Sequence, residues 1–305
     1  MIPPQPVSPP WFQPKSKRQL FYIIAILLFA IAGAWKYGLG YIKRLNAAAP
    51  PPVIQKARNL MEDRKFEEAA ALLVPVIQEI EKGRGPEDPS LLKHFDLLAV
   101  IYGEMDKHAD AEPLWRRARE IRSKNLGPEH PETIGSGDKL AKCLMAQGKF
   151  ADAEPLLRQS LTHREGYWGL DAPEIMPSLN HMAELFLKQK KYAEAEAFAV
   201  RAVKIGRAKT GLLPPSYADS MRLLADAYAG QEKWDDAAPL YDGAVKQKVK
   251  LLPDAPHIPP KPGQISHGDF ADLCKDYAAV LRKSGKEKEA KELEAKAEAA
   301  LKPRE

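Results

Sequence analysis

Histidines are the residues of this 305-residue chain best suited to binding a metal ion or transferring protons. The chain has seven of them, and they do not cluster in the sequence. His130 lies in a Gly-Pro-Glu-His-Pro segment, whereas His94, His163 and His181 fall far apart in segments predicted to be helices. This spacing predicts no metal site, and we expect no cofactor.

Other motifs that carry catalysis are missing from the sequence. It contains no His-Glu-x-x-His motif, no phosphate-binding Walker loop and no Gly-x-Ser-x-Gly motif. Cys143 and Cys274 have no Cys-x-x-Cys neighbour, so we interpret them as small core residues. The sequence therefore predicts a protein that is not an enzyme, unless a partner completes a composite site, and no small-molecule substrate is expected.

The most regular feature of the chain is a phrase of the form aromatic-x-x-Ala that recurs with a constant step of 42 residues. Its five copies are Phe66/Ala69, His108/Ala111, Phe150/Ala153, Tyr192/Ala195 and Trp234/Ala237, with histidine as the one substitution at the aromatic position. The same step separates Ala99, Ala141, Ala183 and Ala225, and also Pro89, Pro131, Pro173 and Pro215. A period of roughly 20–50 residues indicates a stacked solenoid, in which no single unit can bury its apolar face alone.

Each repeat has the pattern of two amphipathic helices. Between Ile175 and Phe186, apolar residues recur at helical spacing, and the polar residues 188–191 then interrupt them. A second apolar stripe runs from Tyr192 to Ile205 and stops at Gly211, which is followed by two prolines. Small alanines in both stripes allow two helix backbones to approach closely, so the repeat unit is predicted to be a helical hairpin.

The segments around these helices resemble a known family. Residues 127–133 (Gly-Pro-Glu-His-Pro-Glu-Thr) link two units, residues 147–156 lead into a second helix, and residues 179–183 (Leu-Asn-His-Met-Ala) are similar to the motif Leu-Asn-Asn-Leu-Ala. Together with the 42-residue step, they resemble the longer, kinesin-light-chain-like form of the tetratricopeptide repeat over about residues 54–300. The resemblance implies a right-handed superhelix whose first helices line a concave, peptide-binding groove. It does not name the partner.

The predicted fold is therefore all-α, a right-handed superhelical solenoid of about six helical hairpins with one N-terminal transmembrane helix. The predicted segments are a Pro-rich tail (1–18), the transmembrane helix (19–43), a linker (44–53), the solenoid (54–283) and a charged C-terminal capping helix (284–305). A Pro-rich insertion at 253–264 breaks the 42-residue step. We interpret it as a rigid spacer, with a docking element as the alternative.

The transmembrane helix is predicted from an apolar run near the N-terminus. Leu20 to Trp35 contains no charged residue, and the run reaches Ile42 if Lys36 extends toward the headgroups. A helix of that length spans roughly 34 Å, which is enough to cross a bilayer core. A cleaved signal peptide is the alternative, although the long Pro-rich segment before the run argues against it.

Charge is concentrated beside this apolar run. The chain has a net charge of +5, of which residues 1–50 contribute +6, so the remaining residues sum to −1. Nucleic-acid binding is not expected, because the repeats have no basic excess, whereas the flanking basic residues suit anionic lipid. The basic residues before the run slightly favour a cytoplasmic N-terminus, which would place the repeats on the periplasmic side of a bacterial inner membrane.

The partner-binding groove is predicted from the repeat register. The inward-facing positions of the first helices are Asp96, Asp138, Asn180, Arg222 and Lys275, and the charged positions one turn further on are Lys142, Glu184 and Asp226. The first row changes from acidic to basic along the chain, which would orient a bound segment. An ordinary mixed-charge surface is the alternative.

These features predict a membrane-anchored scaffold for protein–protein interaction. It would bind a peptide or a subunit of another protein in the concave groove, and it would contact membrane lipid through the N-terminal helix. Such a scaffold suits the assembly of a membrane or envelope complex. The alternative is a structural subunit that assembles into a large membrane complex through its convex face.

Overall fold

The computed structural model describes residues 52–208, 215–252 and 266–301. The chain divides into two compact units, residues 1–52 and 53–305, and the description below concerns the second. The predicted Pro-rich tail, the transmembrane helix and the insertion at 253–264 lie outside the described residues, as does all but the end of the linker. None of the helices described is both long enough and apolar enough to cross a membrane.

Twelve α-helices make up the described residues, which contain no strand. In chain order they form the hairpins α2 (Pro52–Glu62) with α3 (Phe66–Arg84), α4 (Leu92–Glu104) with α5 (His108–Leu126), α6 (Pro131–Ala146) with α7 (Phe150–Trp168), α8 (Met176–Lys188) with α9 (Tyr192–Arg207), α10 (Pro215–Gly230) with α11 (Trp234–Lys248), and α12 (His267–Lys283) with α13 (Glu287–Leu301). Short 3-10 helices, η1 (Pro89–Leu91), η2 (Pro173–Ile175) and η3 (Val249–Leu251), precede α4, precede α8 and follow α11. The prediction of an all-α fold with six helical hairpins is confirmed. Helix α13 stands where the capping helix was predicted.

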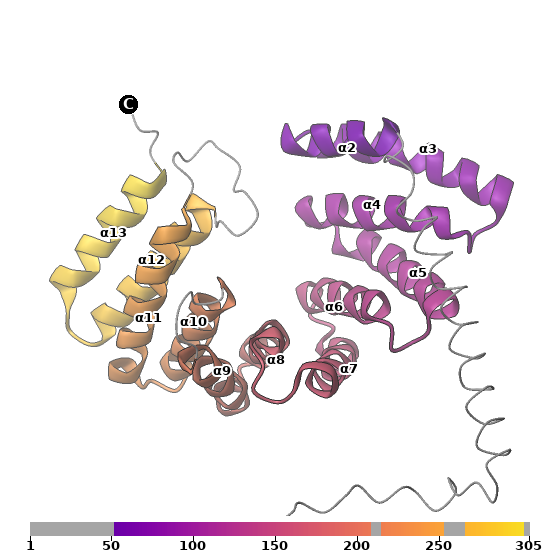
Figure 1. Ribbon diagram of the computed structural model, residues 1–305. Helices are drawn as coiled ribbons and strands as arrows, with labels where there is room; N and C mark the ends of the chain where they lie inside the picture. Colours follow the sequence, from indigo (N-terminus) through magenta and orange to yellow (C-terminus); the bar gives the residue numbers. More distant parts are fainter. Residues whose placement is uncertain (1–51, 209–214, 253–265, 302–305) are drawn as a thin grey trace, which may run out of the picture. The chain divides into compact units, whose positions relative to one another are not determined.

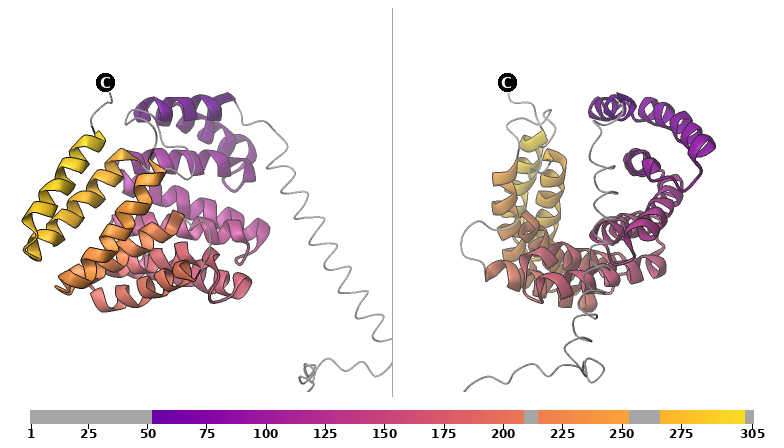
Figure 2. Two further views of the ribbon diagram at one scale, coloured as in Figure 1. Left: turned by 60° about the vertical axis from the view of Figure 1, so that its left-hand side comes forward. Right: turned by 45° about the vertical axis from the view of Figure 1, so that its right-hand side comes forward.

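The hairpins stack in chain order, as Figures 1 and 2 show. Each second helix from α3 to α11 packs against the first helix of the next hairpin, and α8 also packs against α10. In Figure 1 the first helices α4, α6, α8, α10 and α12 lie on the inner side of the curve that this unit makes, and the second helices lie outside. We call the side formed by these first helices the inner face and the side formed by the second helices the outer face.

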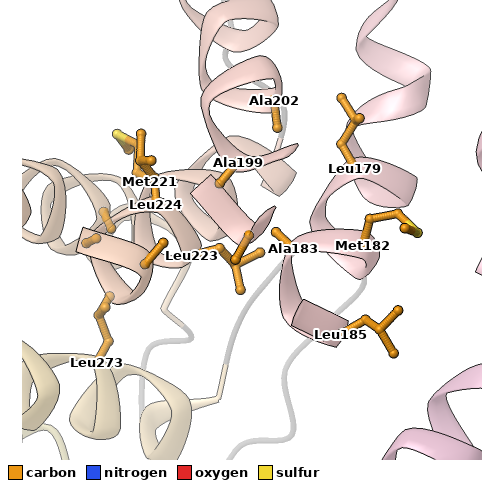
Figure 3. Close-up of a cluster of buried hydrophobic side chains, with 14 of the residues drawn as sticks. Leu179, Met182, Ala183, Leu185, Ala199, Ala202, Met221, Leu223, Leu224 and Leu273 are labelled. Atoms are coloured by element: carbon orange, nitrogen blue, oxygen red, sulfur yellow. The ribbon is translucent and has the colours of Figure 1, made fainter. Parts of the chain in front are cut away.

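The recurring alanines are what allow the helices to pack this closely. All nine alanines of the two 42-residue series are buried, with exposed fractions of 0–1%. Figure 3 shows Ala183 of α8 and Ala199 of α9 among larger side chains from α8, α10 and α12. A larger side chain at these sites would separate the helices or force strained rotamers, so the small residues fix the geometry of each hairpin.

The turn inside each hairpin also repeats. Arg64, Asp106, Gly148, Lys190 and Glu232 follow the 42-residue step, and all have positive φ values between 55° and 74°. This left-handed conformation strains residues other than glycine, asparagine or aspartate. Its appearance at every step therefore indicates that the packing of the paired helices, and not the preference of the local residue, sets the turn.

Candidate functional site

The inner face carries the eight residues predicted to bind a partner, because all of them lie on first helices. Asp96 lies on α4, Asp138 and Lys142 on α6, and Asn180 and Glu184 on α8. The remaining three are Arg222 and Asp226 on α10 and Lys275 on α12. No contact with a partner is shown, so binding by these residues stays a prediction, but their surroundings differ sharply.

Asp96 is held by an arginine from the second helix of its own hairpin. Arg122 of α5 donates to both carboxylate oxygens of Asp96, at 3.1 Å and 2.5 Å. The same guanidinium donates to the hydroxyl of Ser136 on α6 at 2.9 Å, which links this hairpin to the next. Lys139 of α6 adds a weaker ion pair to Asp96 at 3.9 Å. The carboxylate is thus largely committed to contacts between helices.

Asp138 repeats this arrangement one step along the chain. Arg164 of α7 donates to its carboxylate at 2.7 Å, and also to the hydroxyls of Ser160 on α7 and Ser178 on α8. Only 7% of Asp138 is exposed. A buried charge is tolerated only when it is paired, so the pair with Arg164 is part of the packing between the third and fourth hairpins.

The fourth hairpin has lost both members of this pair together. Asn180 replaces the aspartate, and Gly206 stands where the arginine would be. The side-chain amide of Asn180 donates to the carbonyl of Ser216 at 3.0 Å, and its oxygen accepts from Ser220 at 2.7 Å. Asn180, which is also 7% exposed, therefore joins α8 to α10 without any charge.

Arg222 and Asp226 form an ion pair on α10, with 2.8 Å between the guanidinium and the carboxylate. Tyr241 of α11 donates a hydrogen bond to the other carboxylate oxygen. Burial raises the pKa of Asp226, although Arg222 and the tyrosine hydroxyl act in the opposite direction. Burial likewise raises the pKa of Asp276 on α12. The structure thus brings two of the predicted residues together in a half-buried cluster.

Three predicted residues remain accessible on the inner face. Lys142 and Lys275 are exposed, and Lys275 lies 3.1 Å from the carboxylate of Asp272 on the same helix. Glu184 is half-buried and lies 3.9 Å from Lys188. Exposed ion pairs within one helix contribute little to stability, so these side chains are free to exchange partners. They are the positions best placed to contact another molecule.

His181 of α8 belongs to the same region, although its sequence position gave no sign of a special environment. Its pKa is lowered from the usual 6.5 to about 4, first by burial and then by the positive charge of Lys142, while Asp138 acts in the opposite direction. Because the folded protein holds this proton less tightly than the unfolded chain, stability is full above pH 6.5 and falls as the pH drops toward 4.

Replacing His181 by asparagine tests this dependence. We expect the free energy of unfolding of the unmodified protein to fall on the order of 1–3 kcal/mol more than that of His181→Asn between pH 7 and pH 4. Urea unfolding followed by circular dichroism at several pH values measures the difference. If the free energies of unfolding of the two proteins changed equally with pH, His181 would not be the source of the pH dependence.

Within the described ranges, no group of three histidine, cysteine, aspartate or glutamate side chains is placed to hold a metal ion. Cys143 and Cys274 are buried free thiols, and burial raises the pKa of both. A thiol with a raised pKa is a poor nucleophile, which fits their interpretation as small core residues.

A patch of exposed apolar residues lies where α7 leads into the fourth hairpin. Tyr167 is 71% exposed, Trp168 52% and Leu170 62%. The two rings pack edge to face with centroids 4.8 Å apart. Large apolar side chains that stay exposed together often mark contact surfaces, so this turn is a second surface available to a partner.

Comparison with known proteins places this architecture among repeat proteins. A family model described as "Tetratricopeptide repeat" matches residues 91–166, 134–208 and 174–247. No curated protein matches the sequence significantly.

Several solved structures share the fold. One is a Podosopora anserina protein named for kinesin light chain and for nearly identical TPR-like repeats, at 24% identity over 70% of this chain and 95% of that chain, with a TM-score of 0.53. BtubC (BKLC) from P. vanneervenii has 17% identity over 80% and 95%, with a TM-score of 0.57. PilW, described as a type IV pilus biogenesis factor, has 16% identity over 82% and 94%, with a TM-score of 0.54.

Proposed function

The chain belongs to the tetratricopeptide repeat family, and on this premise we propose that it is a scaffold that binds a segment of another protein on its inner face. The observation that carries the proposal is that accessible charged side chains lie on three of the first helices, Lys142 on α6, Glu184 on α8 and Lys275 on α12. They lie beside a framework already fixed by internal ion pairs, so a partner would meet a rigid surface. Rigid surfaces bind with a smaller loss of conformational entropy.

The structure changes which residues are suitable for testing this binding. Asp138 is buried in an ion pair, so reversing its charge would disturb the fold before it reported on any partner. Lys142 and Lys275 are exposed, and neither forms an ion pair with a residue on another described helix. Their substitution is therefore a cleaner test.

We expect the double variant Lys142→Glu/Lys275→Glu to recover at least about tenfold less of its partners than the unmodified protein, because two charges on the inner face are reversed. The measurement is quantitative mass spectrometry of proteins that co-purify with the full chain from gently solubilised membranes. Arg158→Glu/Lys246→Glu, on the exposed outer side of α7 and α11, is the matched control. Equal losses in the two variants would point to nonspecific charge effects and would sink the proposal.

The scaffold is further proposed to be anchored in a membrane through residues 19–43, with the repeats on the periplasmic side of a bacterial inner membrane. The support is the apolar run and its flanking aromatic and basic residues. Confining both partners to one membrane surface would raise their effective concentration without any new contact. Protease treatment of sealed membrane vesicles whose periplasmic side faces outward tests the orientation. Repeats on the periplasmic side would be digested, whereas repeats on the cytoplasmic side would be protected.

A role in assembling a membrane or envelope complex suits such an anchored scaffold. The structural neighbour PilW is described as a type IV pilus biogenesis factor, which is a role of this kind. The identity of the proteins recovered in the co-purification experiment tests this part of the proposal directly.

A further inference from the structure

A cavity of about 480 Å³ opens on the outer face between α9 and α11, with α10 beneath it. Val203, Leu224 and Leu240 are buried at its walls, whereas Val200 at its rim is 41% exposed. Ligand pockets in proteins commonly have volumes of about 300–1,000 Å³. The cavity is therefore large enough to receive more than one side chain of a partner.

The corresponding groove one step earlier, between α7 and α9, is filled by side chains of this chain. Phe186 of α8 and Phe198 of α9 stack there, with ring centroids 5.6 Å apart. One step of 42 residues later, Tyr228 and Leu240 occupy these positions. Leucine has no ring to stack on the tyrosine, so part of the space that Phe198 fills is empty at Leu240.

The ion pair that closes the earlier groove is also missing. Arg201 of α9 pairs with Glu165 of α7 and donates to the carbonyl of Leu170. The equivalent positions one step later are Gly243 and Arg207. A glycine cannot bridge the two helices, and the acid has become a base.

The groove between α5 and α7 is covered by a different side-chain contact, which the groove between α9 and α11 also lacks. There, Arg119 of α5 donates to Gln159 of α7 at 3.1 Å and lies across the groove. The positions two steps later are Val203 and Gly243. The groove between α9 and α11 therefore lacks the stacked ring, the ion pair and the covering arginine found in the earlier grooves, and Leu240, Arg207 and Val203, which stand at three of these positions, line the cavity.

Charge at the rim of the cavity is unbalanced. Lys204 and Arg207 of α9 are exposed, and neither forms an ion pair with a described residue. Asp235 and Asp236 lie in the first turn of α11, and Asp236 contributes to the rim. A polyanion such as nucleic acid would meet these two carboxylates, whereas a segment with carboxylates at one end only would avoid them.

We propose that this cavity binds an acidic segment of a partner protein, with one or two large apolar side chains in the cavity and carboxylates beside Lys204 and Arg207. The apolar walls supply the driving force, because they are shielded from water when the segment binds. The two unpaired cations select the acidic end and so set the direction of the segment. The site lies on the opposite face from the proposed inner-face site and does not depend on it.

The test uses the full chain in nanodiscs of zwitterionic lipid and a fluorescein-labelled synthetic peptide, in which two leucines one helical turn apart are followed by three glutamates. We expect saturable binding by fluorescence anisotropy, and at least about tenfold weaker binding by Lys204→Glu/Arg207→Glu. That variant should bind the peptide with lysines in place of glutamates better than the unmodified protein does.

Two further variants test whether the cavity itself, and not the charged surface around it, binds the peptide. Leu240→Phe, which restores the ring of the earlier groove, should weaken binding of the glutamate peptide by at least about tenfold. Lys246→Glu is the matched control, because Lys246 is the equivalent of Lys204 one step along and does not line the cavity. Equal binding of the glutamate and lysine peptides, no binding of either, or equal losses in Lys246→Glu and Lys204→Glu/Arg207→Glu would overturn the proposal.

Discussion

Replacing Arg164 by methionine is expected to lower the free energy of unfolding by about 3–5 kcal/mol. The reason is that the carboxylate of Asp138, which is only 7% exposed, would lose the cation that pairs with it at 2.7 Å. Methionine keeps much of the volume of the arginine side chain, so the loss reports mainly on charge. Urea unfolding of the full chain, followed by circular dichroism, measures the change.

Two comparisons make this prediction specific. The double variant Asp138→Asn/Arg164→Met should be more stable than Arg164→Met alone, because the asparagine carries no buried charge. Arg158→Met lies on the same helix but breaks only an exposed ion pair with Glu154, so it should cost less than about 0.5 kcal/mol. If Arg158→Met and Arg164→Met were equally costly, the buried pair would not have the structural role assigned to it.

Replacing Gly206 by alanine is expected to destabilise the protein by about 2–3 kcal/mol or more. A Cβ atom at Gly206 would overlap the ring of Tyr217, which packs directly against the glycine. The ring belongs to α10 and is buried, so it has little room to move. The junction between the fourth and fifth hairpins therefore depends on the absence of a side chain at this position.

The matched control for this variant is Gly166→Ala. Gly166 lies in α7 with no neighbouring atom within 4 Å of a built Cβ, so alanine should stabilise the helix by up to about 1 kcal/mol. Tyr217→Ile removes the ring and introduces the residue type that stands 42 residues earlier, at Ile175. Gly206→Ala/Tyr217→Ile should therefore recover stability relative to Gly206→Ala, and failure to do so in thermal unfolding would argue against the ring contact as the cause.

The repeat register predicted which residues occupy equivalent positions on the first helices, but it did not predict which of them are buried or paired with other helices. It placed Asp96, Asp138 and Asn180 at equivalent positions, and the structure shows all three in contacts between helices. The missed residues were Arg122 and Arg164. A signal existed in the sequence, because each arginine lies 26 residues after an aspartate, and both members change together at Asn180 and Gly206.

The sequence by itself determined the six hairpins, their order and the sites of close helix packing. These follow from apolar residues at helical spacing and from alanines at a fixed step, which are properties of one helix and its immediate neighbour along the chain. Only the tertiary structure decided that Asp138 is buried in an ion pair, and that a cavity opens between α9 and α11. Both depend on side chains from three helices meeting at one point, and the small rotations that bring them together are set by the packing of whole helices against one another.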